Sequence, residues 1–385
     1  MNVPFNRVEA TPHMVEAVTR SLSSGHWSGD GTFTAQVLEK LHQLMPEPLL
    51  LLTTSASQAL EMAVVLAGIK AGDEVILPSY TYASCANAVL SAGGLPVFAA
   101  VSQETLCLAP ESVERLMSPS VKAIMPVHYG GVPAEMDLLM TLCRERGLTL
   151  IEDAAQAIGS SWKGRALGTL GDFGAISFHD TKNVTSGEGG LLLVGADRKD
   201  LWEQAQILHQ KGTDRLQFLQ GHRDRYEWVG QGVSASPSEL LMALLLPQLE
   251  AVEAINQRRL EIVGRYESVM KPLEISRNLI LSHSKVSKGG NGHLFFLRFK
   301  DAGNAAAFMA FMAARGIDVR THYQPLHASP QGRGFRHDPV LHSVGDRDLM
   351  KCVVRLPMSH HLKDEEIDYV CEVLKDALIH CHTRL

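Results

Sequence analysis

The strongest constraint on the fold is a regular alternation of short apolar runs with helix-length amphipathic segments between Leu49 and Gly195. The apolar runs are LLLL, EVILP, LPVFAA, KAIMPV, LTLIED, AISF and GLLLV, and the segments between them include SQALEMAVVLAGI and PAEMDLLMTLCRERG. Strands that are apolar along their whole length lie in the centre of a sheet that helices cover on both faces. The sequence therefore predicts an α/β fold with a mostly parallel central sheet.

The pattern changes after this region. Apolar residues at nearly helical spacing predict one long helix over residues 237–270, which would connect two parts of the chain. A strand over 293–299 and helices over 302–315 and 365–377 then predict a smaller α/β unit. The 385 residues are enough to bury more than one core. We expect a large domain over 1–255, including an N-terminal arm, and a small C-terminal domain over 256–385.

Charge and composition exclude several classes of function. The chain has 36 basic and 42 acidic residues and no dense basic run, which argues against nucleic acid as a partner. Its longest apolar runs, such as Leu240 to Leu246, are too short to span a membrane. Six cysteines lack metal-ligand spacing, and the first residues do not resemble a secretion signal. We therefore expect reduced thiols, no metal site and a cytoplasmic location.

The residues that follow the predicted strands are the first candidates for a site, because open α/β sheets bind ligands at the carboxyl ends of their strands. Ser55, Ala56 and Ser57 follow LLLL and begin a predicted helix. Free N–H groups at a helix N-terminus suit a phosphate, although serine also caps helices that bind nothing. Both interpretations remain open from this segment alone.

Asp153 follows the run LTLIE directly. Strand alternation turns the side chain of Glu152 toward the opposite face, so Asp153 has no second carboxylate or histidine at ligand spacing. The carboxylate could bind a metal, act as a base or pair with a positively charged heterocycle. The last of these fits its surroundings best.

Lys182 follows AISFHDT and precedes the glycine-rich SGEGG. A lysine held in such a constrained turn is poorly solvated, so it loses its proton more easily and can form an imine. A nucleotide phosphate loop is the alternative, but the chain lacks GxxxxGK[ST] and these glycines precede a strand. A lysine, an anion for a ring nitrogen and a phosphate site are together what pyridoxal phosphate requires.

Longer segments carry a resemblance to a known family. TTSASQALEMA, PSYTYASCANAV, EDAAQAIGSSWKGRALGTLGDFGAISFHDTKN, SGEGG and THYQPLH resemble the DegT/DnrJ/EryC1/StrS sugar aminotransferases, over nearly the whole chain. SGDGTFT, HDTKN and residues 211–228 are most similar to the TDP-4-keto-6-deoxy-D-glucose 4-aminotransferases of enterobacterial common antigen synthesis. The resemblance implies fold type I of the pyridoxal-phosphate enzymes. It also implies amino transfer from glutamate to that keto sugar, giving TDP-4-amino-4,6-dideoxy-D-galactose.

The resemblance implies roles for the matching positions. Lys182 would hold the cofactor covalently and move a proton between the substrate carbon and the cofactor. Asp153 would pair with the pyridine nitrogen, and Gln156 would contact the ring face or its 3′-oxygen. Tyr82 would stack on the ring, although a core tyrosine is an equal alternative. The phosphate would be held by Ser55, Ala56, Ser57 and Ser177.

Further positions concern the sugar and a second subunit. His322 and Tyr323 match residues that approach the sugar, but a structural histidine is as common. Relatives place an asparagine of the neighbouring subunit on the phosphate, and Ser234 stands there in this chain. Ala100 stands where the family has an aspartate after the third strand, which puts a structural hydrogen bond in doubt. The resemblance implies a homodimer with its sites at the interface.

Three other functions would use the same cofactor. An aminotransferase of different regiochemistry would share every motif. Relatives that dehydrate deoxysugars replace the lysine by histidine, whereas this chain retains Lys182. A regulatory protein that binds the cofactor without turnover would carry an appended DNA-binding motif, and the sequence contains nothing that resembles one. Amino transfer between glutamate and a sugar nucleotide is therefore the leading hypothesis.

Overall fold

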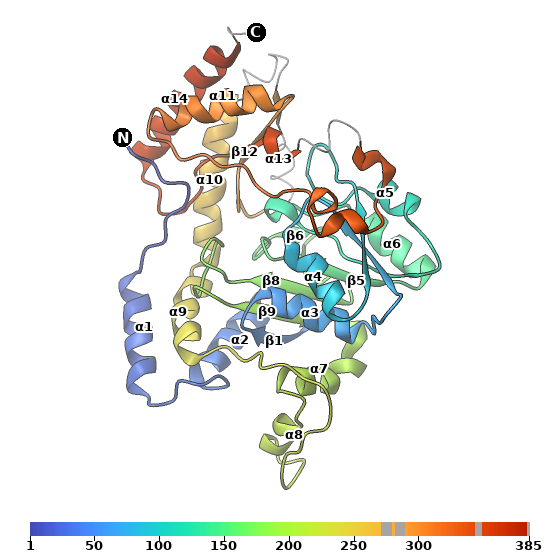
Figure 1. Cartoon of the computed structure of the whole chain (residues 1–385). Helices are drawn as coiled ribbons and strands as arrows, with labels where there is room; N and C mark the ends of the chain where they lie inside the picture. The colour runs from blue at the N-terminus through green and yellow to red at the C-terminus, as the bar shows by residue number, and fades with distance from the viewer. Residues whose placement is uncertain (271–278, 282–288, 343–348, 383–385) are drawn as a thin grey trace.

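The computed structural model describes residues 1–270, 279–281, 289–342 and 349–382 (Figure 1). Its centre is a seven-stranded sheet with the order β1-β9-β8-β5-β4-β2-β3. The strands are β1 Leu49–Thr53, β2 Glu74–Pro78, β3 Leu95–Ala99, β4 Val121–Ile124, β5 Thr149–Asp153, β8 Phe173–Ser177 and β9 Gly190–Val194. Only β9 runs antiparallel to its neighbours β1 and β8. The predicted α/β fold with a mostly parallel sheet is confirmed.

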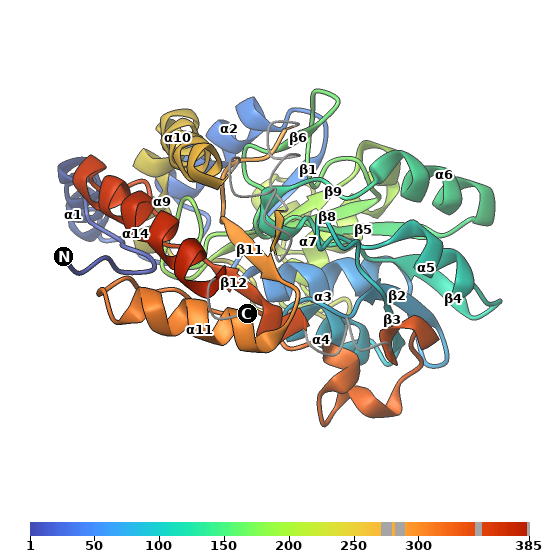
Figure 2. The ribbon, with the colours of Figure 1, turned by 90° about the horizontal axis from the view of Figure 1, so that it is seen from above.

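Helices cover both faces of this sheet (Figure 2). On one face lie α3 Ala56–Leu66, α4 Ala83–Ser91 and α7 Trp202–His209; on the other lie α2 Thr32–Leu44, α6 Met136–Arg146 and α9 Glu239–Glu250. Within β2, Ile76 belongs to one core and Val75 and Leu77 to the other, because neighbouring strand residues point to opposite faces. This is why the central strands are apolar without a break.

The single helix predicted over residues 237–270 is wrong, because the structure has two helices there. α9 ends at Glu250 and α10 begins at Val252 and continues to Met270. Between them the N–H of Ala251 donates to the carbonyl oxygen of Gln248, three residues back, which tightens the turn. Pro247 also lies inside α9, where it cannot donate a helical hydrogen bond. The junction turns the chain from the large sheet toward the C-terminal part.

The C-terminal part has its own antiparallel sheet, in the order β10-β11-β12, formed by Leu279–Leu281, Phe296–Phe299 and Val353–Arg355. Two helices, α11 Ala302–Ala313 and α14 Asp364–His382, lie side by side against it (Figures 1 and 2). The strand predicted over 293–299 thus begins only at Phe296, and the last helix is longer than predicted. Besides short 3-10 helices, the remaining elements are α1 Pro12–Ser23, α5 Pro110–Arg115, β6 Ser161–Trp162, β7 Arg165–Ala166, α8 Arg215–Leu219 and α13 Leu349–Cys352.

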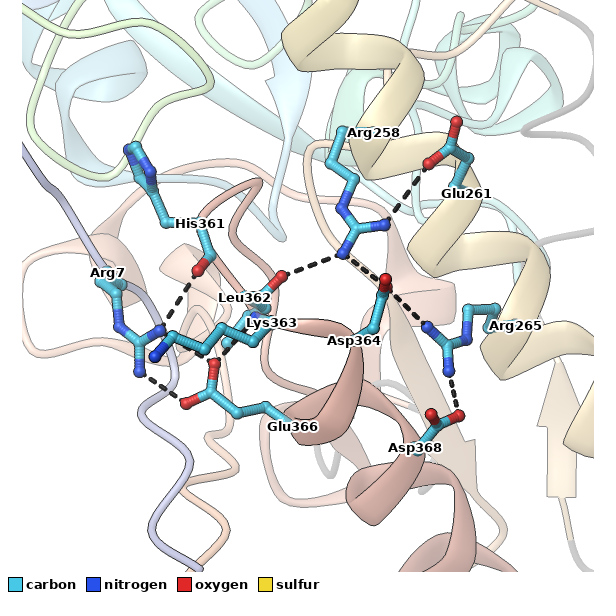
Figure 3. A network of polar contacts seen from close by, with 10 residues as sticks. All are labelled: Arg7, Arg258, Glu261, Arg265, His361, Leu362, Lys363, Asp364, Glu366 and Asp368. Atoms are coloured by element: carbon cyan, nitrogen blue, oxygen red, sulfur yellow. Dashed lines mark hydrogen bonds and ion pairs between the residues drawn. The ribbon is translucent and has the colours of Figure 1, made fainter. Parts of the chain in front are cut away.

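The N-terminal arm is joined to this C-terminal part. Val3 forms a parallel bridge with Ile317 and is buried in the same core as α11 and α14. The carbonyl oxygen of Phe5 accepts a hydrogen bond from the backbone N–H of Met358. The guanidinium of Arg7 forms a bidentate ion pair with Glu366 of α14 (Figure 3). The arm therefore lies as an extra strand-like segment along the C-terminal part.

α10 is bound to α14 by a second set of charges (Figure 3). Arg258 and Arg265 of α10 both contact the carboxylate of Asp364, and Arg265 also pairs with Asp368. These side chains are partly exposed, so each ion pair alone contributes little to stability. Together the pairs fix the position of α10 against α14. The division into 1–255 and 256–385 remains a prediction, and its boundary falls within α10.

The described residues contain neither a membrane-spanning helix nor a cluster of metal-ligand side chains. None of their helices has the length and apolarity needed to cross a bilayer. No cluster of three or more His, Cys, Asp or Glu side chains in the same ranges could hold a metal ion.

Candidate active site

A cavity of about 880 Å³ opens at the carboxyl ends of β5 and β8, between the large sheet, the C-terminal part and the N-terminal arm. Almost all site residues predicted from the sequence line it: Ser55, Ala56, Ser57, Tyr82, Asp153, Gln156, Ser177, Lys182, His322 and Tyr323. Ser234 does not line the cavity of its own chain. It is exposed, and its backbone bridges to Gln210.

Lys182 lies in the loop between β8 and β9. Its backbone N–H donates to the carbonyl oxygen of His179, and the N–H of Asp180 donates to that of Gly187, which fixes the loop. Burial of the amine, against the opposing effect of Asp153 and with a smaller contribution from the charge of Arg355, lowers the Lys182 pKa to about 8. Roughly a tenth of this amine is therefore neutral, and thus nucleophilic, at pH 7, far more than at the ordinary lysine pKa of 10.5.

The carboxylate of Asp153 at the end of β5 is held from two sides. Its Oδ1 accepts the backbone N–H of Ala155 at 3.0 Å, and its Oδ2 accepts the thiol of Cys85 at 2.9 Å. The thiol is fully buried, and the neighbouring carboxylate together with burial raises the Cys85 pKa, so the thiol keeps its proton and remains a donor. Each carboxylate oxygen retains a lone pair for the N–H of a heterocycle.

Glu152, one residue earlier, points away from the cavity as strand alternation predicts. Its carboxylate is completely buried and contacts Nε2 of His128 at 2.9 Å. It also accepts the backbone N–H groups of Gly168, Leu170 and Gly171 at 2.6 to 2.9 Å. Glu152 therefore shapes the loop beneath β5, and its role is structural.

We expect Glu152→Leu to lower the free energy of unfolding by about 3 kcal/mol, because it leaves three backbone donors and His128 buried without an acceptor. Urea denaturation followed by circular dichroism measures the change. Glu145→Leu, at an exposed position of α6, is the matched control and should stay within about 0.5 kcal/mol. Equal unfolding midpoints for the two variants would contradict this structural role.

The N-terminus of α3 forms the second wall of the cavity. The hydroxyl of Ser55 accepts the N–H of Gln58, so Ser55 does cap the helix. The N–H groups of Ala56 and Ser57 make no hydrogen bond to the described residues. At Gly190 a Cβ would come within 2.3 to 2.5 Å of the Ser55–Ala56 peptide, so only glycine lets β9 begin so close to this helix end. The free N–H groups suit a phosphate.

Aromatic side chains form the third wall. His322 and Tyr323 stack with ring centroids 3.6 Å apart, and Gln156 donates from its amide nitrogen to the Tyr323 hydroxyl at 2.9 Å. Nδ1 of His322 lies 2.6 Å from the hydroxyl of Tyr129. Burial lowers the His322 pKa to about 2, so its imidazole is neutral at physiological pH. Tyr82 is 61% exposed at the rim, 6.2 Å from the Tyr323 ring.

Some contacts in this site had no signal in the sequence. The sequence predicted Cys85 only as a reduced thiol and did not mark Tyr129, because their partners Asp153 and His322 lie far away in the chain. The arrangement nevertheless fits pyridoxal phosphate. A weakly basic lysine, a fixed carboxylate and unpaired N–H groups of a helix end line one cavity, and these are the groups that its aldehyde, ring nitrogen and phosphate need.

Comparisons with known proteins agree with this fit. The model of the DegT/DnrJ/EryC1/StrS aminotransferase family matches residues 9–375. The spore coat polysaccharide biosynthesis protein SpsC of Bacillus subtilis is 29% identical over 374 residues, covering 94% of each chain. Spr1654 from Streptococcus pneumoniae, solved in a PMP form and in a PLP form, has 25% identity; the PMP form has a TM-score of 0.88 and covers 100% of this chain and 99% of that one.

A second solved structure leads to the same group. The aminotransferase TlmJ from Streptoalloteichus hindustanus has 26% identity and a TM-score of 0.85, with 99% of each chain covered. The full-length match of the family model, the shared fold type I architecture and the cavity around Lys182 thus agree. The chain belongs to the DegT/DnrJ/EryC1/StrS aminotransferase family and is a pyridoxal-phosphate-dependent sugar aminotransferase.

Proposed function

We propose that this protein transfers the amino group of glutamate to C4 of TDP-4-keto-6-deoxy-D-glucose and yields TDP-4-amino-4,6-dideoxy-D-galactose. The observation that carries the proposal is the single cavity in which Lys182, Asp153 and the N-terminus of α3 face the His322–Tyr323 pair. Its volume of about 880 Å³ leaves room for a sugar nucleotide next to a cofactor. SGDGTFT, HDTKN and residues 211–228 favour this keto sugar within the family.

Each residue of the cavity has a separate task in this proposal. Pyridoxal phosphate, when bound, supplies the aldehyde that accepts the amino group and the ring that withdraws electrons from the reacting carbon. Lys182 would hold that aldehyde when no substrate is bound, and its free amine would take and return the proton of the reacting carbon. Asp153 would keep the ring nitrogen protonated, and Ala56, Ser57 and Ser177 would hold the phosphate.

The sugar lies against the aromatic wall in this proposal. Gln156 fixes the Tyr323 hydroxyl through a 2.9 Å hydrogen bond and thereby sets the position of the ring that stacks on His322. A neutral His322 accepts or donates hydrogen bonds to sugar hydroxyls without placing another charge beside Lys182. Tyr82 covers the cavity from its exposed rim.

Product analysis tests the acceptor and the position of amination. The purified protein is incubated with glutamate and, in parallel, with the 4-keto-6-deoxy and the 3-keto-6-deoxy sugar nucleotides, and each product is assigned by NMR. We expect an axial amino group at C4 of the galacto-configured product. Amination only at C3, or only of another sugar nucleotide, would leave the family membership intact and refute the proposed substrate.

The low pKa of Lys182 gives a pH dependence that can be measured during cofactor binding. Only the neutral amine attacks the aldehyde, so capture of pyridoxal phosphate by the apo-protein should accelerate as the pH rises and level off above about 8. Stopped-flow absorbance between pH 6 and pH 10 measures this rate. A rate that continues to rise toward pH 10, as the ordinary lysine pKa of 10.5 demands, would contradict the assigned environment.

We also propose a homodimer in which Ser234 completes the phosphate site of the partner subunit. Ser234 is exposed and lies outside its own cavity. The nearby α8 projects from the body of the molecule (Figure 1), and Phe218, Tyr226 and Trp228 on and after it are 36%, 52% and 81% exposed. Exposed aromatic residues gathered on one projection are typical of an interface.

Light scattering of the active holoenzyme tests this assembly. We expect a mass near twice the 42.1 kDa of one chain. A fully active monomer would refute the homodimer. We place the enzyme and its reduced cysteines in the cytoplasm, and the free thiols of Cys85, Cys107, Cys143, Cys352 and Cys371 support that proposal. The similarity to SpsC supports a role in polysaccharide biosynthesis.

A further inference from the structure

Arg355, at the end of β12, lines the same cavity as Lys182 and Asp153. Its Nε and Nη2 both donate to the carbonyl oxygen of Thr321, at 3.2 and 2.8 Å. Its Cζ also lies 4.7 Å from the centre of the Phe5 ring, which belongs to the N-terminal arm. The carbonyl and the ring together hold the guanidinium in one orientation, while Nη1 makes no hydrogen bond to the residues that the structure describes.

The charge of Arg355 has no counterion in the protein. Within the described ranges, no carboxylate lies within ion-pair distance of its guanidinium, whereas the neighbouring Arg320 pairs with Asp318 at 2.7 Å. Arg320 pairs with Arg355 through an antiparallel backbone bridge and also lines the cavity, with its Cζ 5.3 Å from the Phe5 ring. Two arginines therefore lie close to one aromatic ring, and of the two only Arg320 has a carboxylate partner among the described residues.

An uncompensated cation in a partly desolvated cavity is unfavourable until an anion binds there. Burial lowers the Arg355 pKa, and its charge in turn lowers the pKa values of His322 and Lys182, so its field reaches the reacting groups. The planar guanidinium matches a carboxylate with two parallel hydrogen bonds. The cavity thus offers a preformed site for a carboxylate.

This site is separate from the one for the cofactor phosphate. The phosphate site is the N-terminus of α3 in the large sheet, whereas Arg355 belongs to β12 in the small C-terminal sheet. An anion at Arg355 must therefore belong to a substrate. Of the two substrates, the amino donor carries its carboxylates close to the reacting nitrogen, while the sugar separates its pyrophosphate from the reacting carbon by the sugar ring.

We propose that Arg355 binds a carboxylate of the dicarboxylic amino donor and thereby selects that donor over uncharged amines. The proposal rests on the proposed function, because it assigns the donor site of the same reaction. The Thr321 carbonyl and the Phe5 ring are positioning groups for the guanidinium. The N-terminal arm, through Phe5, therefore takes part in recognition of the donor without touching it.

The experiment separates the two halves of the reaction in the holoenzyme. Conversion of the cofactor absorbance by glutamate is followed in single turnovers, and the return by the keto sugar is followed with enzyme aminated in advance. We expect Arg355→Gln to lower the apparent second-order rate constant with glutamate by about 100-fold and the rate with the keto sugar by less than about 3-fold. Arg355→Lys should recover part of the loss, because it restores the charge without the fork.

Arg144→Gln is the matched control, since it makes the same substitution at an exposed position of α6 that does not line the cavity. It should change neither half by more than about 3-fold. Equal losses in both halves for Arg355→Gln, or a larger loss with the keto sugar, would overturn the donor site and indicate a contact with the pyrophosphate. Failure of the unmutated enzyme to react with glutamate would instead refute the proposed function.

A direct binding measurement guards against a variant that fails to fold. Glutarate, which carries two carboxylates and no amino group, should perturb the cofactor absorbance of the unmutated holoenzyme in a saturable way, and its uncharged dimethyl ester should not. Glutarate affinity that is unchanged in Arg144→Gln and lower in Arg355→Lys supports the site. No difference between the diacid and its ester would overturn it.

Discussion

Replacement of Lys182 by alanine should lower the turnover of the enzyme by at least about 10⁴-fold. The side chain has two tasks that nothing else in the cavity can perform. It holds the cofactor aldehyde, and it moves the proton at the reacting carbon. Its pKa of about 8 suits both, because the same amine must be neutral as a nucleophile and as a base. Product formation measured by chromatography gives the effect on turnover.

Two controls separate this effect from a general loss of structure. Lys122→Ala removes an exposed lysine at the opposite end of the fold and should leave turnover unchanged. Lys182→Ala should also still bind pyridoxal phosphate, because the α3 N-terminus and Asp153 remain, but without the absorbance of the covalent form. Turnover within about 10-fold of the unmutated enzyme would mean that the catalytic amine lies elsewhere.

Asp153→Asn should lower turnover by about 10³-fold, because it replaces a fixed negative charge by a neutral amide where the ring nitrogen must stay protonated. The substitution keeps the size of the side chain. It retains an acceptor for either Ala155 or Cys85, which hold the carboxylate at 3.0 and 2.9 Å. We therefore expect the fold to survive and both half-reactions to slow together.

The Asp153 and Arg355 variants should differ in which half-reactions they slow. A residue that acts on the ring nitrogen slows both half-reactions, whereas a donor-binding residue slows only one of them. Asp137→Asn, at an exposed carboxylate that pairs with Lys163, is the control and should have no effect on either half. An Asp153→Asn enzyme that is slow only with glutamate would show that the carboxylate contacts the substrate and not the ring.

Much of the fold follows from patterns that are local in the sequence. The unbroken apolar strands predicted a sheet with two covered faces, and β2 shows the reason, since Ile76 and its neighbours serve different cores. The antiparallel direction of β9 and the break at Ala251 had no such signal. At the break the N–H of Ala251 donates to the carbonyl oxygen of Gln248, three residues back. This bond leaves the helical spacing of apolar residues unchanged on both sides, so the sequence pattern does not reveal it.

The site was predictable where position along a strand determines direction. Alternation distinguished Asp153 from Glu152, and the structure places the first in the cavity and the second in a buried network with His128. The partners that tune these groups were not predictable. Cys85 lies 68 residues before Asp153, and the uncompensated charge of Arg355 is visible only once β12 packs beside Thr321 and Phe5.

The most direct test of the account is the absorbance of the purified holoenzyme during one cycle of its two substrates. We expect a band near about 415 nm that moves to about 330 nm with glutamate and returns on addition of TDP-4-keto-6-deoxy-D-glucose, because the covalent bond to Lys182 creates the first band and amination removes it. Protein that acquires no such band after incubation with pyridoxal phosphate would contradict the role of Lys182 and of the cavity around it.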